Sequence, residues 1–308
     1  MRSAPDAVCY VQLMSRWIAA ALVALAISVF HPAPTAAWGF SAHKFIMERA
    51  IALLPPQIRP FFVKYRTTVV EHAIDPDTYR TVGFTEEPPR HFLDMDAYGP
   101  FPFAGLPHDY NEAVASRGAD FVMKNGVLPW RTQELYDRLR DAFKQTSPYA
   151  RDDIKLFSAV VSHYIADAFQ PFHAAINYDG QLTGQQGIHS RFETELFERY
   201  QTRLRITAGP LVPIKSPREF VFATLTDSFS LVEPILAADR AAVQGKDQYD
   251  DAYFRQLFAS TRPILEKRIS QSIAGVASVI TAAWIESGRT PVPLDAPRAV
   301  RKVRRGGS

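Results

Sequence analysis

Histidines and carboxylates are concentrated between His163 and Glu193, in a chain that has only eight histidines in 308 residues. His163 and Asp167 are four residues apart, and His189 and Glu193 repeat that spacing after a loop. Residues four apart lie on the same face of an α-helix, so each pair could reach one cation. Imidazole nitrogen with carboxylate oxygen is a ligand set that favours zinc. With a further imidazole at His173, the stretch predicts a metal site.

Each of these residues also has an ordinary explanation. A single histidine beside apolar residues is usually a core histidine that donates a hydrogen bond to a carbonyl. An isolated His-x-x-x-Asp pair is therefore weak support for a metal site. The number of candidates in so short a stretch changes this balance, because burying all of them without a metal would leave several charges without a partner.

The elements that must position these side chains are helices separated by proline-rich loops. Apolar periodicity predicts helices over 41–54, up to about residue 74, over 131–146, over 152–170, around 189 and over 265–284. Ser41 is expected to cap the first helix and Gly288 to end the last. The stretch Glu86–Tyr110, rich in prolines and aromatics, predicts a structured surface loop. Without strand alternation, the expected fold class is all-α, a single multi-helix domain.

The N-terminus has the features of a secretory signal peptide. An apolar run, Trp17–Phe30, follows Arg16 and precedes the small residues Thr35 and Ala37. The run is too short to span a membrane. Residues 1–37 are therefore predicted to be removed, which makes the protein exported, either periplasmic or secreted.

Composition divides the rest of the chain into a domain, 38–288, and a basic tail, 289–308. The tail is rich in arginine, so the formal net charge of +3 does not describe the domain, which carries no surplus of basic residues for a nucleic-acid groove. A short basic terminus of this kind is usually disordered, although it could contact an anionic membrane surface. Cys9, the only cysteine, precedes the predicted cleavage point, so packing or metal must stabilise the mature chain.

The stretches HYIADAFQPFHAAIN and GIHSRFE resemble the signature of zinc-dependent phospholipase C and of its relatives, the single-strand-specific zinc nucleases. That superfamily combines His-x3-Asp-x5-His with a later His-x3-Glu or His-x3-Asp. Its other ligands are a mature N-terminal Trp, a His shortly after it, and an Asp followed by a His in a loop. The chain fills these positions in the same order with Trp38, His43, Asp77 and His91.

The resemblance implies about three zinc ions and assigns ligands to each. The first ion would be held by Asp77, His91, His163 and Asp167. Asp167 would bridge to a third ion, held also by His43 and by the amine and carbonyl oxygen of Trp38. The second ion would be held by His173, His189 and Glu193. Asp75 also precedes His91, and Asp77 is favoured over it for its spacing. His72 and His108 have no place in the pattern.

Clustered zinc ions suit hydrolysis of phosphate esters because they screen the charge of the substrate and lower the pKa of a bound water to about 7. The resemblance suggests Asp77 as the group that orients or deprotonates this water. No Gly-x-Ser-x-Gly motif or mature cysteine offers a different nucleophile. The predicted activity is hydrolysis of a phosphodiester by a metal-activated water.

The choice between phospholipid and single-stranded nucleic acid rests on small differences. Glu193, the short step from His173 to His189, and the missing disulfides are similar to phospholipase C. The five-residue step from Trp38 to His43 is similar to the nucleases. Phe92 could stack on a base, pack against a quaternary ammonium, or simply pack within its loop. We expect a phospholipase C-like enzyme, with a nuclease as the alternative.

A non-catalytic protein that zinc only stabilises is a third interpretation. Structural zinc sites are closed by four protein ligands, whereas the predicted second site has three and leaves a position for water or substrate. The ligand count therefore favours an enzyme. The sequence indicates no obligate protein partner, so we expect a monomer.

Overall fold

The computed structural model describes residues 38–145, 149–245, 248–292 and 294, which all belong to the unit Ala36–Ser308. The predicted signal peptide, with Cys9, and most of the basic tail lie outside the described residues. In the described part of the chain the regular elements are helices, and no strand occurs. The predicted all-α fold is confirmed.

The helices lead from the N-terminal side of the domain to a central hairpin. In order they are α2 (Phe40–Leu53), α3 (Arg59–Lys64), α4 (Arg66–Glu71), η1 (His72–Ile74), α5 (Asp75–Thr81), η2 (Pro88–Arg90), η3 (Met95–Tyr98), α6 (Tyr110–Arg117), α7 (Ala119–Lys124), α8 (Leu128–Lys144) and α9 (Ala150–Ala168). Then follow η4 (Pro171–Ala174), α10 (Ile188–Ser190), the π-helical turn η5 (Arg191–Glu195), α11 (Leu196–Tyr200), η6 (Gln201–Arg203), α12 (Pro217–Phe229), α13 (Val232–Val243) and α14 (Asp251–Glu286).

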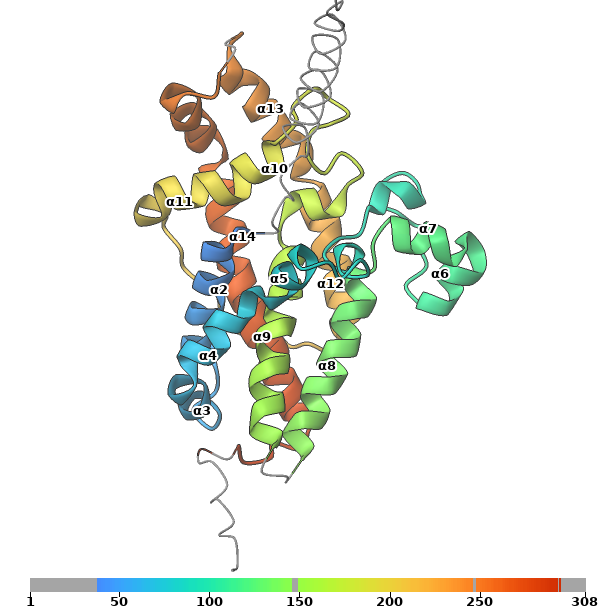
Figure 1. Cartoon of the computed structure of the whole chain (residues 1–308), viewed down its shortest axis with the longest axis vertical. Helices are drawn as coiled ribbons and strands as arrows, with labels where there is room; N and C mark the ends of the chain where they lie inside the picture. Colours follow the sequence, from blue (N-terminus) through green and yellow to red (C-terminus); the bar gives the residue numbers. More distant parts are fainter. Residues whose placement is uncertain (1–37, 146–148, 246–247, 293, 295–308) are drawn as a thin grey trace, which may run out of the picture. The chain divides into compact units, whose positions relative to one another are not determined.

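Helix α9 is the element around which the others pack. It contacts α2, α4, α8, α12 and α14, and Figure 1 shows it flanked by several of these helices. Every residue from Ser158 to Ala168 is buried, so the second half of the helix has no solvent-facing side. A helix buried all round usually carries apolar side chains, yet this half contains His163 and Asp167. These polar side chains therefore need partners inside the core.

The long helix α14 holds the end of α9 in place. Its buried Arg268 donates from Nε to the carbonyl of Phe169, at 2.8 Å, and from Nη2 to the carbonyl of Thr224 in α12, at 3.3 Å. The same guanidinium pairs with Asp227. The prediction of a long final helix is confirmed, and the chain leaves it at Gly288, whose φ of 91° suits glycine.

Two apolar helical stretches are long enough to cross a membrane by length and composition alone, namely 217–243 and 251–286. The first joins two separate helices, α12 and α13, and 72% of the apolar window of the second is buried inside the protein. Core helices of soluble proteins pass the same test, so these stretches are weak support for a membrane span.

The start of α2 differs from the sequence prediction. Gly39, not Ser41, is the N-cap residue, and no side chain caps the helix. Ser41 instead donates its hydroxyl hydrogen to Glu198 Oε1 at 3.2 Å. A Cβ atom on Gly39 would lie only 2.6 Å from Thr194 Oγ1, so close packing against η5 fixes where the chain enters the helix. The predicted Ser41 cap is wrong.

The aspartates near residue 75 begin a helix. The sequence predicted that the preceding helix would end there, and η1 does end at Ile74, but α5 starts directly at Asp75. Pro76 occupies the first turn, where a missing N–H costs nothing, and Asp75 and Asp77 lie at the positive end of the helix dipole. The local sequence therefore starts an element that carries Asp77 into the core.

The loop after α5 is anchored by backbone hydrogen bonds, and it buries a carboxylate. The Leu93 amide donates to the carbonyl of His173 at 2.9 Å, and the Asp94 amide donates to the carbonyl of Asn125 at 2.8 Å. The Asp94 side chain is buried, and among the described residues its Oδ1 has no hydrogen-bond partner. Burial, with a smaller contribution from Asp96, raises the pKa of Asp94 to about 7.

Replacing Asp94 should change how stability depends on pH. The folded pKa of about 7 lies above the model value of 3.8, so between these values the folded chain binds a proton that the unfolded chain has lost. Stability contributed by this group therefore falls as pH rises through that window, by about 4 kcal/mol in total. We expect Asp94→Asn to gain on the wild type by this order between pH 4 and 8 in denaturant titrations of metal-free protein.

The matched control for this prediction is Asp120→Asn, because Asp120 is exposed. Its stability difference from the wild type should not vary with pH. An Asp94→Asn difference that is equally flat from pH 4 to 8 would contradict the prediction.

Candidate metal centre

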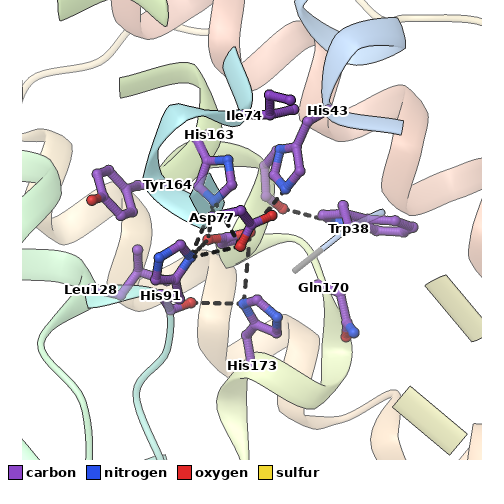
Figure 2. A network of polar contacts seen from close by, with 12 residues as sticks. Trp38, His43, Ile74, Asp77, His91, Leu128, His163, Tyr164, Gln170 and His173 are labelled. Atoms are coloured by element: carbon purple, nitrogen blue, oxygen red, sulfur yellow. Dashed lines mark hydrogen bonds and ion pairs between the residues drawn. The ribbon is translucent and has the colours of Figure 1, made fainter. Parts of the chain in front are cut away.

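Five separate segments bring the predicted ligands together inside the domain. The segments are the start of α2, α5, the loop after η2, α9 with η4, and the turns α10 and η5. Figure 2 shows that several of these side chains point toward one another. All of the predicted ligands are at most 5% exposed: Trp38, His43, Asp77, His91, His163, Asp167, His173, His189 and Glu193.

The carboxylate of Asp167 lies at the centre, with four imidazoles around it. Its Oδ2 is 3.0 Å from His91 Nδ1 and 3.3 Å from His163 Nε2. Its Oδ1 is 3.4 Å from His43 Nε2 and 3.8 Å from His173 Nδ1. Burial alone would raise the pKa of Asp167, but the imidazoles of His163 and His173 outweigh it and hold that pKa well below its ordinary value.

The ligand atoms form three groups, each compact enough for one ion. Within each group the candidate ligand atoms lie within 4.8 Å of one another. The groups are His43 with Asp77 and His163; His91 with His163 and Asp167; and His173 with His189 and Glu193. The first two groups share His163, so they are parts of one cluster.

Backbone carbonyls fix the tautomers of three imidazoles. The Nδ1 atom of each faces a carbonyl: His163 faces Ala73 at 2.9 Å, His173 faces His91 at 2.7 Å, and His189 faces Tyr178 at 2.9 Å. A carbonyl oxygen only accepts, so each Nδ1 carries the hydrogen and donates it. The lone pair is then on Nε2, the atom of each ring that faces the other candidate ligands, and this is the usual outer-shell arrangement of a metal-bound histidine.

Distances between ligand atoms match those expected around a tetrahedral zinc ion. With Zn–N bonds of about 2.0–2.1 Å, two ligand atoms on one ion are about 3.3 Å apart. His91 Nδ1 and His163 Nε2 are 3.1 Å apart, and the Nε2 atoms of His173 and His189 are 3.2 Å apart. Glu193 Oε2 lies 3.0 Å from His189 Nε2 and accepts a hydrogen bond from Gln170 at 2.8 Å.

Several buried ligand atoms have no hydrogen-bond partner among the described residues. They are both nitrogens of His43, both carboxylate oxygens of Asp77, Nε2 of His91, Oδ1 of Asp167 and Oε1 of Glu193. A buried polar atom without a partner costs free energy, and so many in one place are rare. A cation bound at the cluster would satisfy those atoms that face it. The residues present therefore fit zinc.

The charge states of the histidines are uneven in the absence of a metal. Burial lowers the pKa of His43 and lowers that of His173 well below its ordinary value, so both are neutral, as a ligand must be. Burial also opposes a charge on His163, but the carboxylates of Asp167 and Asp77 raise its pKa to about 9. A metal must therefore displace a proton from His163.

Trp38 packs beside the cluster. Its side chain is buried, and its indole Nε1 donates to the carbonyl of Ala166, one residue before Asp167, at 2.8 Å. This hydrogen bond places residue 38 next to the end of α9 (Figure 2). Its role as a ligand through the terminal amine stays a prediction, since residue 37 lies outside the described residues.

The structure separates Asp77 from Asp75. Asp77 is completely buried, and its Oδ1 is 3.9 Å from His163 Nε2. Asp75 instead accepts from His72, whose Nδ1 is 2.8 Å away, near the protein surface. Of the two aspartates, it is Asp77 that reaches the cluster.

Two other residues considered in the sequence lie in packing positions. Phe92 is half-buried, and its backbone and ring lie so close to Gly126 that a Cβ on this glycine would clash with both. His108 stacks on Phe222, with ring centroids 3.9 Å apart, and pairs with Glu219. The substrate contact of Phe92 stays a prediction.

The sequence analysis missed polar residues that surround the ligands. Arg80 Nη2 lies 3.1 Å from Asp77 Oδ1, an ion pair outside hydrogen-bond geometry. Glu87 Oε1 accepts from Tyr164 and lies 3.7 Å from Nε2 of His91. Sequence spacing did contain a signal for Arg80, since it lies one helical turn after Asp77, but only if α5 is recognised as a helix.

Comparison with known proteins agrees with this geometry. The family model of zinc-dependent phospholipase C matches residues 42–232, which is well over half of the chain. The match spans all the candidate ligands from His43 to Glu193. No curated protein matches the chain. The chain belongs to the zinc-dependent phospholipase C family.

Proposed function

We propose that this protein is an exported phosphodiester hydrolase that holds about three zinc ions and acts through a metal-activated water. The observation that carries the proposal is the set of three groups of buried imidazoles and carboxylates, several of whose atoms have no hydrogen-bond partner among the described residues. Membership of the zinc-dependent phospholipase C family supports the same reaction class.

The proposed ligands follow the groups in the structure. Asp77, His91, His163 and Asp167 would hold one ion, and His173, His189 and Glu193 a second. His43, Asp167 and the backbone of Trp38 would hold the third. Asp167 suits the bridging position because its two oxygens face different imidazoles, Oδ2 facing His91 and Oδ1 facing His43.

When bound, zinc lowers the pKa of a water and stabilises negative charge on the phosphoryl and leaving oxygens. Asp77 is the proposed group that orients or deprotonates this water. Its carboxylate is buried, its oxygens have no hydrogen-bond partner in the described part of the chain, and Arg80 holds it from one side. The neighbouring charge of Arg80 fixes the orientation of the carboxylate.

Arg80 is also placed to bind the substrate. Its guanidinium is mostly buried and lies beside Asp77, and its Nε has no hydrogen-bond partner among the described residues. A guanidinium donates readily to phosphate oxygens, which gain negative charge as the reaction proceeds. The proposed role of Arg80 is to donate to a nonbridging phosphoryl oxygen.

A phospholipid is the proposed substrate, on the strength of the family match and of Glu193. A single-stranded nucleic acid is the second candidate. It is favoured by the entry of the chain into α2, which begins at Phe40 directly after Trp38 and Gly39 and leaves no insertion before His43. The proposed protein is a monomer, and its basic tail could add peripheral contact with a membrane.

Turnover tests the proposed function directly. Purified mature protein should contain about three zinc ions and hydrolyse bis(p-nitrophenyl) phosphate; a chelator should abolish this activity, and added zinc should restore it. A panel of phosphatidylcholine, phosphatidylethanolamine, single-stranded DNA and RNA then identifies the substrate class. Full activity after verified removal of zinc would refute the proposal, and cleavage of nucleic acid alone would replace the phospholipase by the nuclease.

Arg80→Leu should slow turnover while leaving zinc bound. Loss of one donor to a developing oxyanion typically lowers kcat by about 100- to 1,000-fold. The measurement is kcat at saturating substrate, with the zinc content of each preparation determined beside it. Arg66→Leu, at an exposed ion pair with Glu48, is the control and should behave as wild type. A wild-type kcat in Arg80→Leu would exclude the proposed contact.

Adding one residue before Trp38 should remove one zinc. A peptide nitrogen is a poor ligand because its lone pair is delocalised, so an ion held by the terminal amine can bind only after the signal peptide is cleaved. N-terminal sequencing of exported protein should read Trp-Gly-Phe-Ser. The extended protein should stay folded by circular dichroism but bind fewer zinc ions. Equal zinc content and rate in the two forms would show that the amine is not a ligand.

A further inference from the structure

Arg191 lies between two of the candidate ligands, but it makes its contacts elsewhere. It is the residue midway between His189 and Glu193, within the π-helical turn η5. Its side chain is almost fully buried, and its partners belong to α13, α14 and the loop before α10. A buried arginine at this position has no place in the proposed chemistry and needs its own explanation.

All three nitrogens of the guanidinium are engaged. Nε donates to the hydroxyl of Tyr253 at 2.8 Å, and Nη1 donates to the carbonyl of Gln186 at 2.8 Å. Nη2 donates to the carbonyl of Gln185 at 3.2 Å and pairs with Asp239 Oδ1 at 3.3 Å. One side chain therefore joins the turn that carries two ligands to its own preceding loop and to two long helices.

Asp239 completes this arrangement from α13. It is completely buried, and it accepts hydrogen bonds from Tyr253 and, at 2.6 Å, from Gln185 Nε2. Burying an ion pair costs desolvation, so a well-packed apolar group of the same volume would serve general stability as well or better. The gain from Arg191 and Asp239 is geometric, because hydrogen bonds fix direction and apolar packing does not.

The chain around Arg191 has little regular structure of its own. After η4 it follows turns to residue 187, and α10, η5 and α11 are each five residues or shorter. Gly187 has a φ of 84°, and a Cβ there would lie 2.9 Å from Arg191 Nη1, so glycine leaves room for the guanidinium. His189 and Glu193 thus depend on contacts outside their own turn for their positions.

We propose that Arg191, held by Asp239 and Tyr253, is a positioning residue for the second metal group, and that it sets the zinc affinity of His173, His189 and Glu193. The inference rests on the proposed function only in that this group binds zinc. Outer-shell partners of metal ligands typically change metal affinity by about 10- to 100-fold when removed. Arg191 acts one step further out, through the backbone of η5.

The test measures zinc binding to the full mature chain rather than turnover. Metal-free wild type, Arg191→Met and Tyr253→Phe are titrated with zinc in competition with a chromophoric chelator, and Glu193→Gln marks the isotherm of a damaged second group. We expect Arg191→Met to weaken one zinc by about 10- to 100-fold and to leave the others unchanged. Tyr253→Phe, which removes one hydroxyl, should weaken the same zinc by a smaller factor, and Arg191→Lys should recover part of the loss.

Arg199→Met is the matched control. Arg199 lies in α11, pairs with Asp251 at 3.3 Å and stacks on Phe254 at 4.1 Å, so it repeats the chemistry of the Arg191 contacts at an exposed site without reaching the loop 185–187. Its zinc isotherm should match that of the wild type. Thermal unfolding of the metal-free proteins shows whether a variant has simply lost stability.

Three outcomes separate the possibilities. One weakened zinc in both Arg191→Met and Tyr253→Phe, with the wild-type isotherm in Arg199→Met, supports the proposal. Unchanged isotherms in folded Arg191→Met and Tyr253→Phe would overturn it, and so would an equal weakening of every zinc, which would mark a general structural role. A wild type that binds zinc but hydrolyses no phosphodiester would refute the proposed function, while the isotherms would still decide the role of Arg191.

Discussion

The buried carboxylate of Asp167 is the constraint on which the rest of this structure depends. It has no solvent exposure, and it is surrounded by imidazoles from α2, from the loop after η2, from its own helix and from η4. A charge in such a place must be compensated, or it would unfold the core around it. The packing of α9 on all sides brings the compensating groups from distant parts of the sequence to one point.

The centre functions as a linked cluster rather than as separate sites. His163 belongs to two of the three groups, and Asp167 faces ligands of both as well as His173 of the third. A change in the occupancy of one group therefore alters the charge that the next group meets. The same sharing suits phosphodiester hydrolysis, in which adjacent cations act together on one phosphoryl group.

Much of this could be predicted from the sequence, and the parts that could not have a common cause. The ligand pairs on α9 and on the later turn were readable because an i, i+4 spacing has one geometric meaning on a helix. Ser41 was misread as a cap because the chain there is fixed by the approach of Gly39 to Thr194, a contact between residues far apart in sequence. Arg80 was missed because α5 was not foreseen, and Arg191 because its partners lie on α13 and α14.

The main chain, rather than side chains, orients three of the imidazoles. His163, His173 and His189 each donate from Nδ1 to a backbone carbonyl, and two of these carbonyls belong to Ala73 and Tyr178. Every amino acid has a carbonyl oxygen, so point mutations at positions 73 and 178 can replace the side chain without removing the acceptor. The tautomers of the ligands are thereby insulated from sequence drift at these positions, and the centre can tolerate variation around it for as long as the backbone keeps its path.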